Sequence, residues 1–177
     1  MNFPAIEYVA DASVDPALDV ALRRLFCTCF PKTPVFQDRR YYNEPPAHRW
    51  LIRGSDGDPV AHVAVHEKLI FIGDTELAFG GVAEVCVHPA FRGRGYVGLL
   101  LADAHERVRQ RGFPFAVLYG NPRYYSSSGY VTVENLYRDL PDENGHVARR
   151  KTDEAMVLPL GPRRWPEGQI YLPGPAF

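Results

Sequence analysis

The feature that most constrains the fold is a strand, a basic loop, a helix and a second strand in direct succession near the middle of the chain. The first strand ends at Val87, and a glycine-rich loop then opens a helix from about Tyr96 to Arg111. Its apolar residues share one helical face, Gly112 ends it, and the nearly all-apolar segment Phe115–Tyr119 follows as a buried strand. Together with the hairpin patterns on either side, this unit predicts an α/β domain built on a mixed sheet.

A second helix is predicted near the N-terminus. Asp15 and Pro16 form a helix start, apolar residues recur at helical spacing as far as Cys29, and Pro31 stops the helix. Residues 31–47 are rich in proline, which predicts a loop with at most a short helix. The other expected elements are the strands Phe3–Ala10, Trp50–Ile52, Val60–Ile72, Tyr130–Leu136 and Ala155–Leu160 and a short helix at Tyr124–Ser128. The length of 177 residues predicts one domain, 1–177, in which residues 161–177 form an extended, proline-rich tail.

Composition limits the classes of partner. Lys and Arg number 20 and Asp and Glu 21, and this net charge of −1 gives no electrostatic reason to expect nucleic acid or an anionic membrane as a partner. No apolar stretch has the length of a membrane span, and the N-terminus lacks the pattern of a secretory signal. The spacing of Cys27, Cys29 and Cys86 fits neither a disulfide framework nor a zinc site. We therefore expect a cytoplasmic protein with reduced thiols and no bound metal.

The loop Arg92-Gly93-Arg94-Gly95 has the chemistry of a phosphate site. Its glycines leave main-chain N–H groups uncovered, the helix end adds partial positive charge, and the two arginines add charged donors. Taken alone, the loop is explained better as a solvated turn that caps the helix. It is not a P-loop, which requires a Gly-Lys-Ser/Thr ending. The letters of a dinucleotide-binding fingerprint occur at Gly93, Gly95 and Gly98, but no acidic residue ends the following strand where that fingerprint requires one.

Two longer motifs give a specific resemblance. The run Val85-Cys86-Val87-His88-Pro89-Ala90-Phe91-Arg92-Gly93-Arg94-Gly95 resembles the acetyl-CoA motif of the GNAT (GCN5-related N-acetyltransferase) superfamily. Further along, Gly120-Asn121-Pro122-Arg123-Tyr124-Tyr125-Ser126-Ser127-Ser128-Gly129-Tyr130 resembles a Gly-Asp/His-Pro-x-Tyr-Tyr-x-x-x-Gly-Phe stretch of one bacterial branch. The two motifs have the order and spacing of the family, and the likeness covers most of the chain. One departure is Val97, which stands where the family usually has Gly or Ala and affects the fit of the pyrophosphate.

The resemblance implies a GNAT fold and a coenzyme A site. The expected fold is a central mixed sheet of six to seven strands flanked by helices, with the parallel strands four and five splayed apart to admit the pantetheine arm. Main-chain groups at the end of strand four would bind the arm, and amides of the loop would bind the pyrophosphate. The residues that the resemblance assigns to coenzyme A are Val85, Cys86, Val87, Arg92, Gly93, Arg94, Gly95, Tyr96, Val97, Gly98, Asn121 and Tyr125.

The resemblance also implies direct transfer of an acetyl group from acetyl-CoA to a primary amine, without a metal. Tyr125 matches the family's tyrosine and would protonate the leaving thiolate, although it could instead be a packing residue. Glu84 is the first candidate for the base, and an equally good explanation is a structural carboxylate paired with Arg53 or with backbone amides. His62, His66 and His88 are further candidates for the base. Tyr41 and Glu44, in the proline-rich loop, are expected to contact the acceptor, and Cys86 is more simply a buried core residue than a nucleophile.

Two other functions remain open at this point. One is a non-catalytic module that binds acyl-CoA as a sensor. The other is a long-chain acyltransferase, because two C-terminal runs are similar to the tail of nodulation-factor N-acyltransferases: Leu158-Pro159-Leu160-Gly161 and Trp165-Pro166-Glu167-Gly168-Gln169-Ile170. Tryptophan and proline there would also clamp an extended tail onto the domain. The sequence leaves open whether the acceptor is a small molecule or a peptide, and whether the protein is a homodimer.

Overall fold

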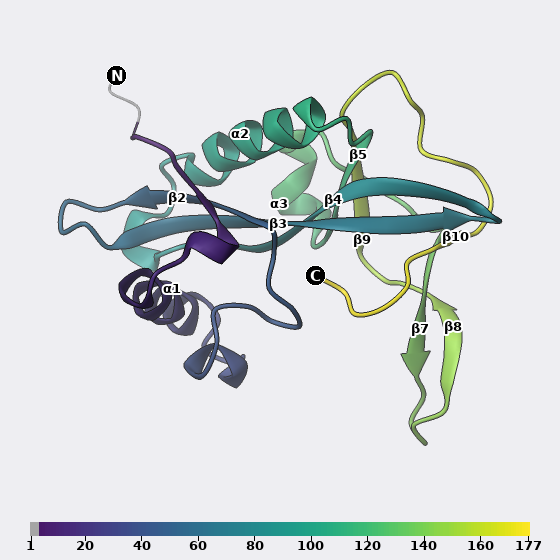
Figure 1. Cartoon of the computed structure of the whole chain (residues 1–177), viewed down its shortest axis with the longest axis horizontal. Helices are drawn as coiled ribbons and strands as arrows, with labels where there is room; N and C mark the ends of the chain where they lie inside the picture. The colour runs from purple at the N-terminus through teal and green to yellow at the C-terminus, as the bar shows by residue number, and fades with distance from the viewer. Residues whose placement is uncertain (1–3) are drawn as a thin grey trace. The chain divides into compact units, whose positions relative to one another are not determined.

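The computed structural model describes residues 4–177, which form two compact units (Figure 1). The first unit takes in the chain up to His66, Val82–Ala104 and Phe177, and the second takes in Glu67–Gly81 and His105–Ala176. The fold is mixed α/β, as expected from the sequence, with antiparallel strand pairs and two parallel pairs, which are β4 (Thr75–Val87) with β5 (Phe115–Tyr119) and β7 (Leu136–Pro141) with β10 (Ile170–Tyr171). Residues 4–177 form ten strands rather than six or seven. The additional ones are two strands of two residues each and one five-residue strand, all of whose residues are exposed, in the second unit.

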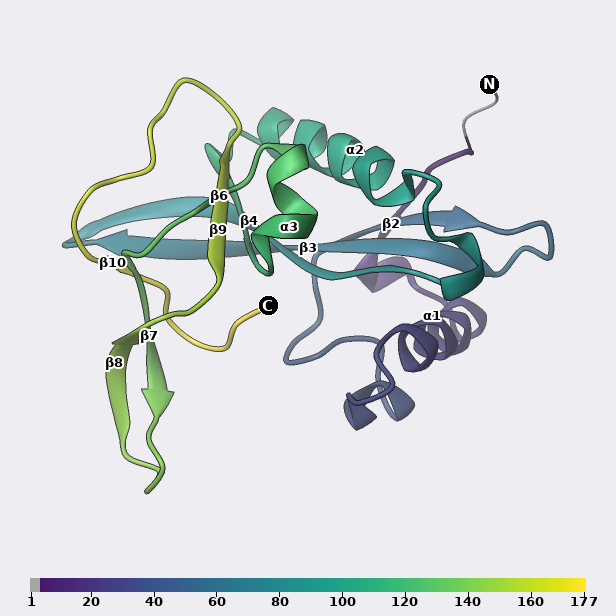
Figure 2. The same ribbon diagram turned by 180° about the vertical axis from the view of Figure 1, so that it is seen from behind.

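The first unit is built on three antiparallel strands. β2 (His48–Arg53) pairs with β1 (Glu7–Ala10) on one edge and with the first part of β3 (Pro59–Ile72) on the other. Successive residues of β2 face opposite sides, so Leu51 joins the core beneath α1 (Pro16–Cys29), while Trp50 Nε1 donates at 2.7 Å to Oδ2 of Asp103 in α2 (Tyr96–Gln110). Figures 1 and 2 show α1 and α2 on opposite sides of β2 and β3.

Helix α1 (Pro16–Cys29) forms because its capping and its apolar spacing agree. The Asp15 carboxylate accepts from the Leu18 amide at 2.8 Å, and Pro16 occupies the first helical position, as predicted. Its buried face packs on β2 and on Cys86 of β4 (Thr75–Val87). Leu22 and Phe26 are fully buried there, which stabilises the unit by about 1.5–3 kcal/mol for each side chain. The short helices η1 (Asp11–Ser13), η2 (Pro34–Gln37) and η3 (Pro89–Phe91) turn the chain between these elements.

The second unit contains both parallel pairs. β4 pairs with β5 (Phe115–Tyr119) through Gly80 and Ala116 and through Gly81 and Val117, and β9 (Ala155–Pro159) lies antiparallel on the other side of β5. The remaining elements are the strands β6 (Val131–Thr132), β7 (Leu136–Pro141), β8 (Val147–Lys151) and β10 (Ile170–Tyr171) and the short helices α3 (Pro122–Tyr125) and η4 (Ser126–Ser128). The predicted strand Tyr130–Leu136 is therefore wrong in part, because β6 and β7 are separate strands.

The chain after residue 160 is held onto the second unit by Trp165. Its Nε1 donates to Asn135 Oδ1 at 2.9 Å, and its ring stands edge-on to Phe115 with centroids 5.1 Å apart. Asn135 in turn donates to the carbonyls of Pro166 and Gly168. The segment is thus clamped by tryptophan, and Ile170 and Tyr171 within it form β10.

Candidate functional site

Glu84 has a backbone conformation that few non-glycine residues adopt. It lies within β4 with φ +44°, in the left-handed region, where the Cβ atom of an L-residue crowds the backbone. Its carbonyl accepts a hydrogen bond from His62 Nδ1 at 2.8 Å. Such strain persists only where neighbouring groups hold the residue in place, and it is frequent at functional sites.

The Glu84 carboxylate is held in an asymmetric environment. Oε1 accepts from the Tyr42 amide at 3.0 Å, whereas Oε2 is excluded from solvent and has no hydrogen-bond partner among the described residues. Burial raises the pKa of Glu84 from 4.5 to about 7, and the positive charge of Arg49 opposes this increase. Arg53, considered from sequence as a partner, is bound to Glu7 instead, with Nε 2.6 Å from Oε2. The backbone-amide alternative is the one that the structure contains.

The other candidates for the base have structural partners. His62 is completely buried and contacts Arg49 and Glu84 through its two ring nitrogens. The Nδ1 atom of His88 accepts from the Ala90 amide at 3.3 Å, where it caps η3. His66 is buried, with its ring 6.0 Å from that of Phe177 and its Nδ1 atom 3.9 Å from Glu44 Oε1.

The predicted acceptor loop lies against Glu84. Tyr42 supplies the amide that binds the carboxylate, and the neighbouring Tyr41 ring lies beneath the Arg39 guanidinium at 5.1 Å. Glu44 follows in the same loop. The first unit therefore brings the candidate base together with the segment that carries Tyr41 and Glu44.

The loop between β4 and α2 (Tyr96–Gln110) has the geometry of an anion cradle. Gly93 and Gly95 are exposed with φ +76° and +74°, and no atom lies within 4 Å of the position where either would carry a Cβ. Arg92 Nε donates back to the Val87 carbonyl at 3.3 Å, and the Arg94 guanidinium lies 4.9 Å above the Phe91 ring. The amides at the start of α2 have no intrahelical partners. These residues fit a diphosphate, because uncovered amides, a helix N-terminus and two guanidinium groups are gathered in one turn.

Cys86 is a core residue. It is buried in the cluster beneath α1, and burial raises the pKa of its thiol well above the ordinary value. A thiol that resists ionisation is a poor nucleophile, so the side chain of Cys86 has a packing role. Its neighbours Val85 and Val87 are only partly buried, which leaves this end of β4 suited to main-chain contacts.

In the second unit, Tyr125 is held by its own segment. The Tyr125 and Tyr130 rings meet edge-on with centroids 6.2 Å apart, and a Cβ on Gly120 would stand 2.5 Å from Cε2 of Tyr125. Asn121 caps α3 by accepting from the Arg123 amide at 2.9 Å, and Gly129, with φ +89°, ends the turn. The glycines of the second motif thus make room for the tyrosine and for the turn.

Sequence reasoning missed Asp11, Tyr42 and Arg49. Tyr42 acts through its amide, which leaves no trace in the sequence. Arg49 carried the better signal, because it lies two residues before the buried Leu51 on β2 and so shares its core-facing side, where a charge requires a partner.

The profile of the acetyltransferase (GNAT) domain matches residues 19–133, more than half of the chain. The chain belongs to the GNAT family of acetyltransferases. The profile match includes β4, the glycine loop, α2, β5 and Tyr125. No curated protein sequence matches the chain.

Solved GNAT structures share the fold at low identity. The GNAT family N-acetyltransferase YhbS from Escherichia coli, in complex with CoA, is 16% identical with a TM-score of 0.68, over 97% of this chain and 92% of that one. A GNAT family acetyltransferase from Brucella melitensis, in complex with acetyl-CoA, is 19% identical with a TM-score of 0.62, over 95% and 96%. A putative N-acetyltransferase from Lactobacillus plantarum is 22% identical with a TM-score of 0.56, over 88% and 99%. The likeness of residues 165–170 to nodulation-factor acyltransferases stays a prediction.

Proposed function

We propose that this GNAT protein transfers an acetyl group from acetyl-CoA directly to a primary amine, with Glu84 as the general base. The observation that carries the proposal is the Glu84 carboxyl itself, whose one oxygen is fixed by the Tyr42 amide and whose other oxygen has no partner among the described residues. Its pKa of about 7 makes it partly ionised at neutral pH, the range in which a base is effective. An alkylammonium group, with a pKa near ~10.4, requires such a base before it can attack a carbonyl.

In the proposed reaction, coenzyme A supplies the thioester as the acyl donor. Amides of Gly93–Gly98, together with Arg92 and Arg94, would hold the pyrophosphate, and main-chain groups at Val85 and Val87 would bind the pantetheine arm. An amide near Val85 would stabilise the negative charge that develops on the carbonyl oxygen. Glu84 would take the proton from the amine, directly or through one water, and Tyr125 would give a proton to the departing sulfur.

The acceptor is proposed to be a small-molecule or peptide amine bound by the loop that carries Tyr41 and Glu44. This loop is tied to the base through the Tyr42 amide, so an amine seated on it would lie near the Glu84 carboxylate. CoA and acetyl-CoA in the two bacterial relatives support the choice of donor.

The deciding experiment measures free thiol released from acetyl-CoA against a panel of primary amines, for the wild type and for Glu84→Gln. We expect release that depends on the amine, and a rate lower by about 10²- to 10⁴-fold in Glu84→Gln. Calorimetry should give the same CoA affinity for both proteins. Tight binding of acetyl-CoA with no turnover on any amine would instead identify a sensor, and a preference for long acyl chains would identify an acyltransferase of the nodulation type.

A further inference from the structure

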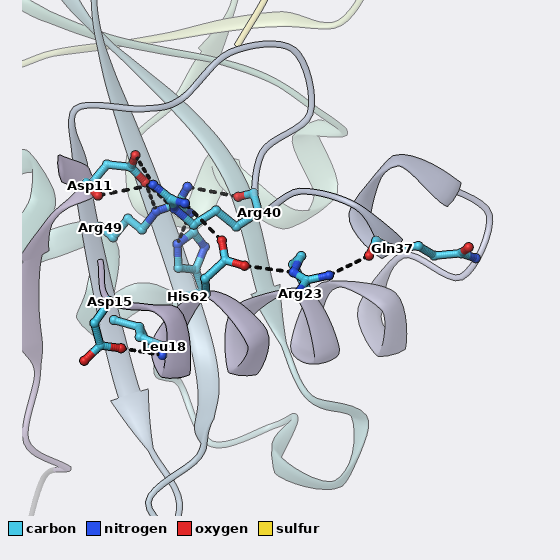
Figure 3. Close-up of polar contacts among 9 residues, drawn as sticks. Asp11, Asp15, Leu18, Arg23, Gln37, Arg40, Arg49 and His62 are labelled. Carbon is cyan, nitrogen blue, oxygen red and sulfur yellow. Dashed lines mark hydrogen bonds and ion pairs between the residues drawn. The ribbon is translucent and has the colours of Figure 1, made fainter. Parts of the chain in front are cut away.

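Charged side chains gather around the buried Arg49 in the first unit (Figure 3). Arg49 is completely buried, and its guanidinium binds three different elements: Nε donates to Asp11 Oδ1 at 2.6 Å, Nη1 contacts His62 Nε2 at 3.1 Å, and Nη2 donates to the Arg40 carbonyl at 2.9 Å. Arg40 also binds Asp11, at 2.7 Å between Nη2 and Oδ2, and Asp19, at 2.9 Å. Each of the three nitrogens of the Arg49 guanidinium thus has a fixed partner.

The arginine determines the tautomer of His62. A guanidinium can only donate, so Nε2 of His62 must be the unprotonated acceptor, and Nδ1 must carry the proton. That proton is donated to the Glu84 carbonyl at 2.8 Å. Burial and the charge of Arg49 lower the pKa of His62 well below its ordinary value, so the ring remains neutral and keeps this orientation.

Arg49 therefore reaches Glu84 by two routes. Through His62 it fixes the carbonyl of the residue whose φ is +44°. Through the Arg40 carbonyl it fixes the loop that continues to Tyr42, whose amide binds the Glu84 carboxylate. One buried side chain thus orients both the backbone and the carboxylate of the candidate base.

We propose that Arg49 and His62 are positioning residues, which hold Glu84 in its left-handed conformation and, through the charge of Arg49, set the pH range in which it accepts a proton. The inference rests on the proposed function only in treating Glu84 as the general base. The hydrogen bonds and backbone conformation of Glu84 are independent of the reaction. Neither residue touches the acceptor or coenzyme A in this scheme. They act through Glu84.

The charges around Glu84 determine the direction in which its pKa should change in a variant of Arg49. Arg49 on β2 favours the ionised carboxylate, and Asp11 in η1 opposes it. The other groups that face Glu84 are the neutral His62 on β3, the Tyr42 amide, and Cys86 on β4, whose thiol pKa is also raised by the Glu84 charge. Removal of the Arg49 charge should therefore raise the pKa of Glu84.

The test variant is Arg49→Gln, and its matched control is Arg40→Gln, which removes a positive charge from the same cluster. Asp11 keeps one arginine in each variant, so no buried carboxylate is left unpaired. For each protein the ¹³C chemical shift of the Glu84 carboxyl is titrated without substrate, with the signal assigned by its loss in Glu84→Gln. The pH profile of kcat/KM is measured in parallel, and CoA affinity reports whether each variant is folded.

In Arg49→Gln we expect the Glu84 titration and the acid limb of the profile to move to higher pH together, by about one unit. In Arg40→Gln we expect both midpoints to stay at the wild-type value. A rate that falls equally at every pH with an unmoved Glu84 titration would mean that Arg49 is merely structural, and the inference would be overturned. A shifted titration in a protein that transfers no acetyl group to any amine would support the positioning role and refute the proposed function.

A second pair of variants carries the test if Arg49→Gln does not fold. His62→Asn keeps an N–H donor near the position of Nδ1, whereas His62→Leu keeps the volume without the donor. We expect His62→Leu to lower kcat at least tenfold with little change in the KM for acetyl-CoA, and His62→Asn to recover part of the loss. Equal kcat values for the two variants would contradict a role for the His62 hydrogen bond.

Discussion

At the scale of the residue, Glu84 combines a strained backbone with a carboxylate of raised proton affinity. The strain costs about 1–2 kcal/mol for an L-residue in the left-handed region, and burial of the carboxyl adds a further cost in free energy. A chain selected only for stability would place glycine at this position of β4. The glutamate is therefore best explained by its chemistry.

This strain can be measured by comparing Glu84→Ala with Glu84→Gly. Both variants lack the carboxylate and its bond to Tyr42, so they differ only in the presence of a Cβ at φ +44°. We expect Glu84→Gly to be more stable than Glu84→Ala by about 1 kcal/mol in chemical denaturation, opposite to the usual order of glycine and alanine in a strand. A more stable alanine variant would show that the backbone relaxes at no cost.

The role of Tyr125 is testable with Tyr125→Phe, which keeps the ring. Its packing against Tyr130 and beside Gly120 should survive, so the substitution removes only the hydroxyl. We expect kcat to fall by about 10²-fold or more and the Kd of acetyl-CoA to change little, as for an acid acting on the leaving group. Parallel losses in kcat and affinity would show instead that the hydroxyl helps to hold the donor.

Individual residues could be predicted from the sequence where a motif carried them, and not where tertiary contacts did. Glu84, Tyr125 and the glycines of the loop were proposed in advance because they lie in or beside the two motifs. Asp11 and Arg49 were not, because they meet across 38 residues of sequence and no local pattern joins them. For the same reason Arg53 was considered as a partner of Glu84, whereas it binds Glu7.

At the scale of the element, the glycine loop and the start of α2 act as one unit. Positive φ at Gly93 and Gly95 turns the chain so that the first amides of the helix remain uncovered. Arg92 closes the turn onto the end of β4, which joins the proposed diphosphate site to the proposed pantetheine site. The local sequence is sufficient to build this element, which is why it was predicted correctly.

Gly95→Val tests the element, with Gly112→Val as its control. Both glycines have positive φ, +74° and +82°, and both have open space around the missing Cβ, so each valine should destabilise the fold by about 1–2 kcal/mol or more. Only Gly95→Val should weaken CoA binding, by about 10- to 100-fold, because only that side chain covers the amides of the loop. Calorimetry with CoA makes the comparison, and unchanged affinity in Gly95→Val would remove the phosphate assignment.

Elements without a pattern of their own were missed or misplaced. Every residue of β8 is exposed and three of its five are basic, so no alternation marks it as a strand, and it forms only by pairing with β7. The predicted strand Tyr130–Leu136 is interrupted before Leu136 because Asn135 binds the segment around Trp165, which lies 30 residues further along the chain. Helix α1 and strand β5 were predicted closely, since cap, periodicity and apolar run agree there.

At the scale of the whole molecule, the family fold accounts for the donor and leaves the acceptor to the loops. Solved GNAT structures with less than a fifth of their residues identical to this chain share its fold, so few side chains are required to specify it. No helix among residues 4–177 is both long enough and apolar enough to cross a membrane. The same residues contain no cluster of three or more His, Cys, Asp or Glu side chains suited to a metal ion.

The dependence of stability on pH should contain two opposing contributions that mutation can separate. His105 is partly buried beside Tyr130, with 2.7 Å between Nε2 and the phenol oxygen, and this burial lowers its pKa to about 4. The unfolded chain binds this proton at about pH 6.5, so the stabilisation is complete above pH 6.5 and is lost as the pH falls towards 4. Glu84 acts in the opposite sense: its pKa is raised to about 7, so its contribution is complete below pH 4.5 and is lost as the pH rises to 7.

Between pH 7 and 4 we expect the free energy of unfolding of His105→Gln to fall less steeply than that of the wild type, and that of Glu84→Gln to fall more steeply. Each difference should reach about 3 kcal/mol at most, measured by urea denaturation at a series of pH values. Curves that run parallel to the wild type would show that neither group has a different pKa in the folded and unfolded states, and would remove the basis for Glu84 as a base at neutral pH.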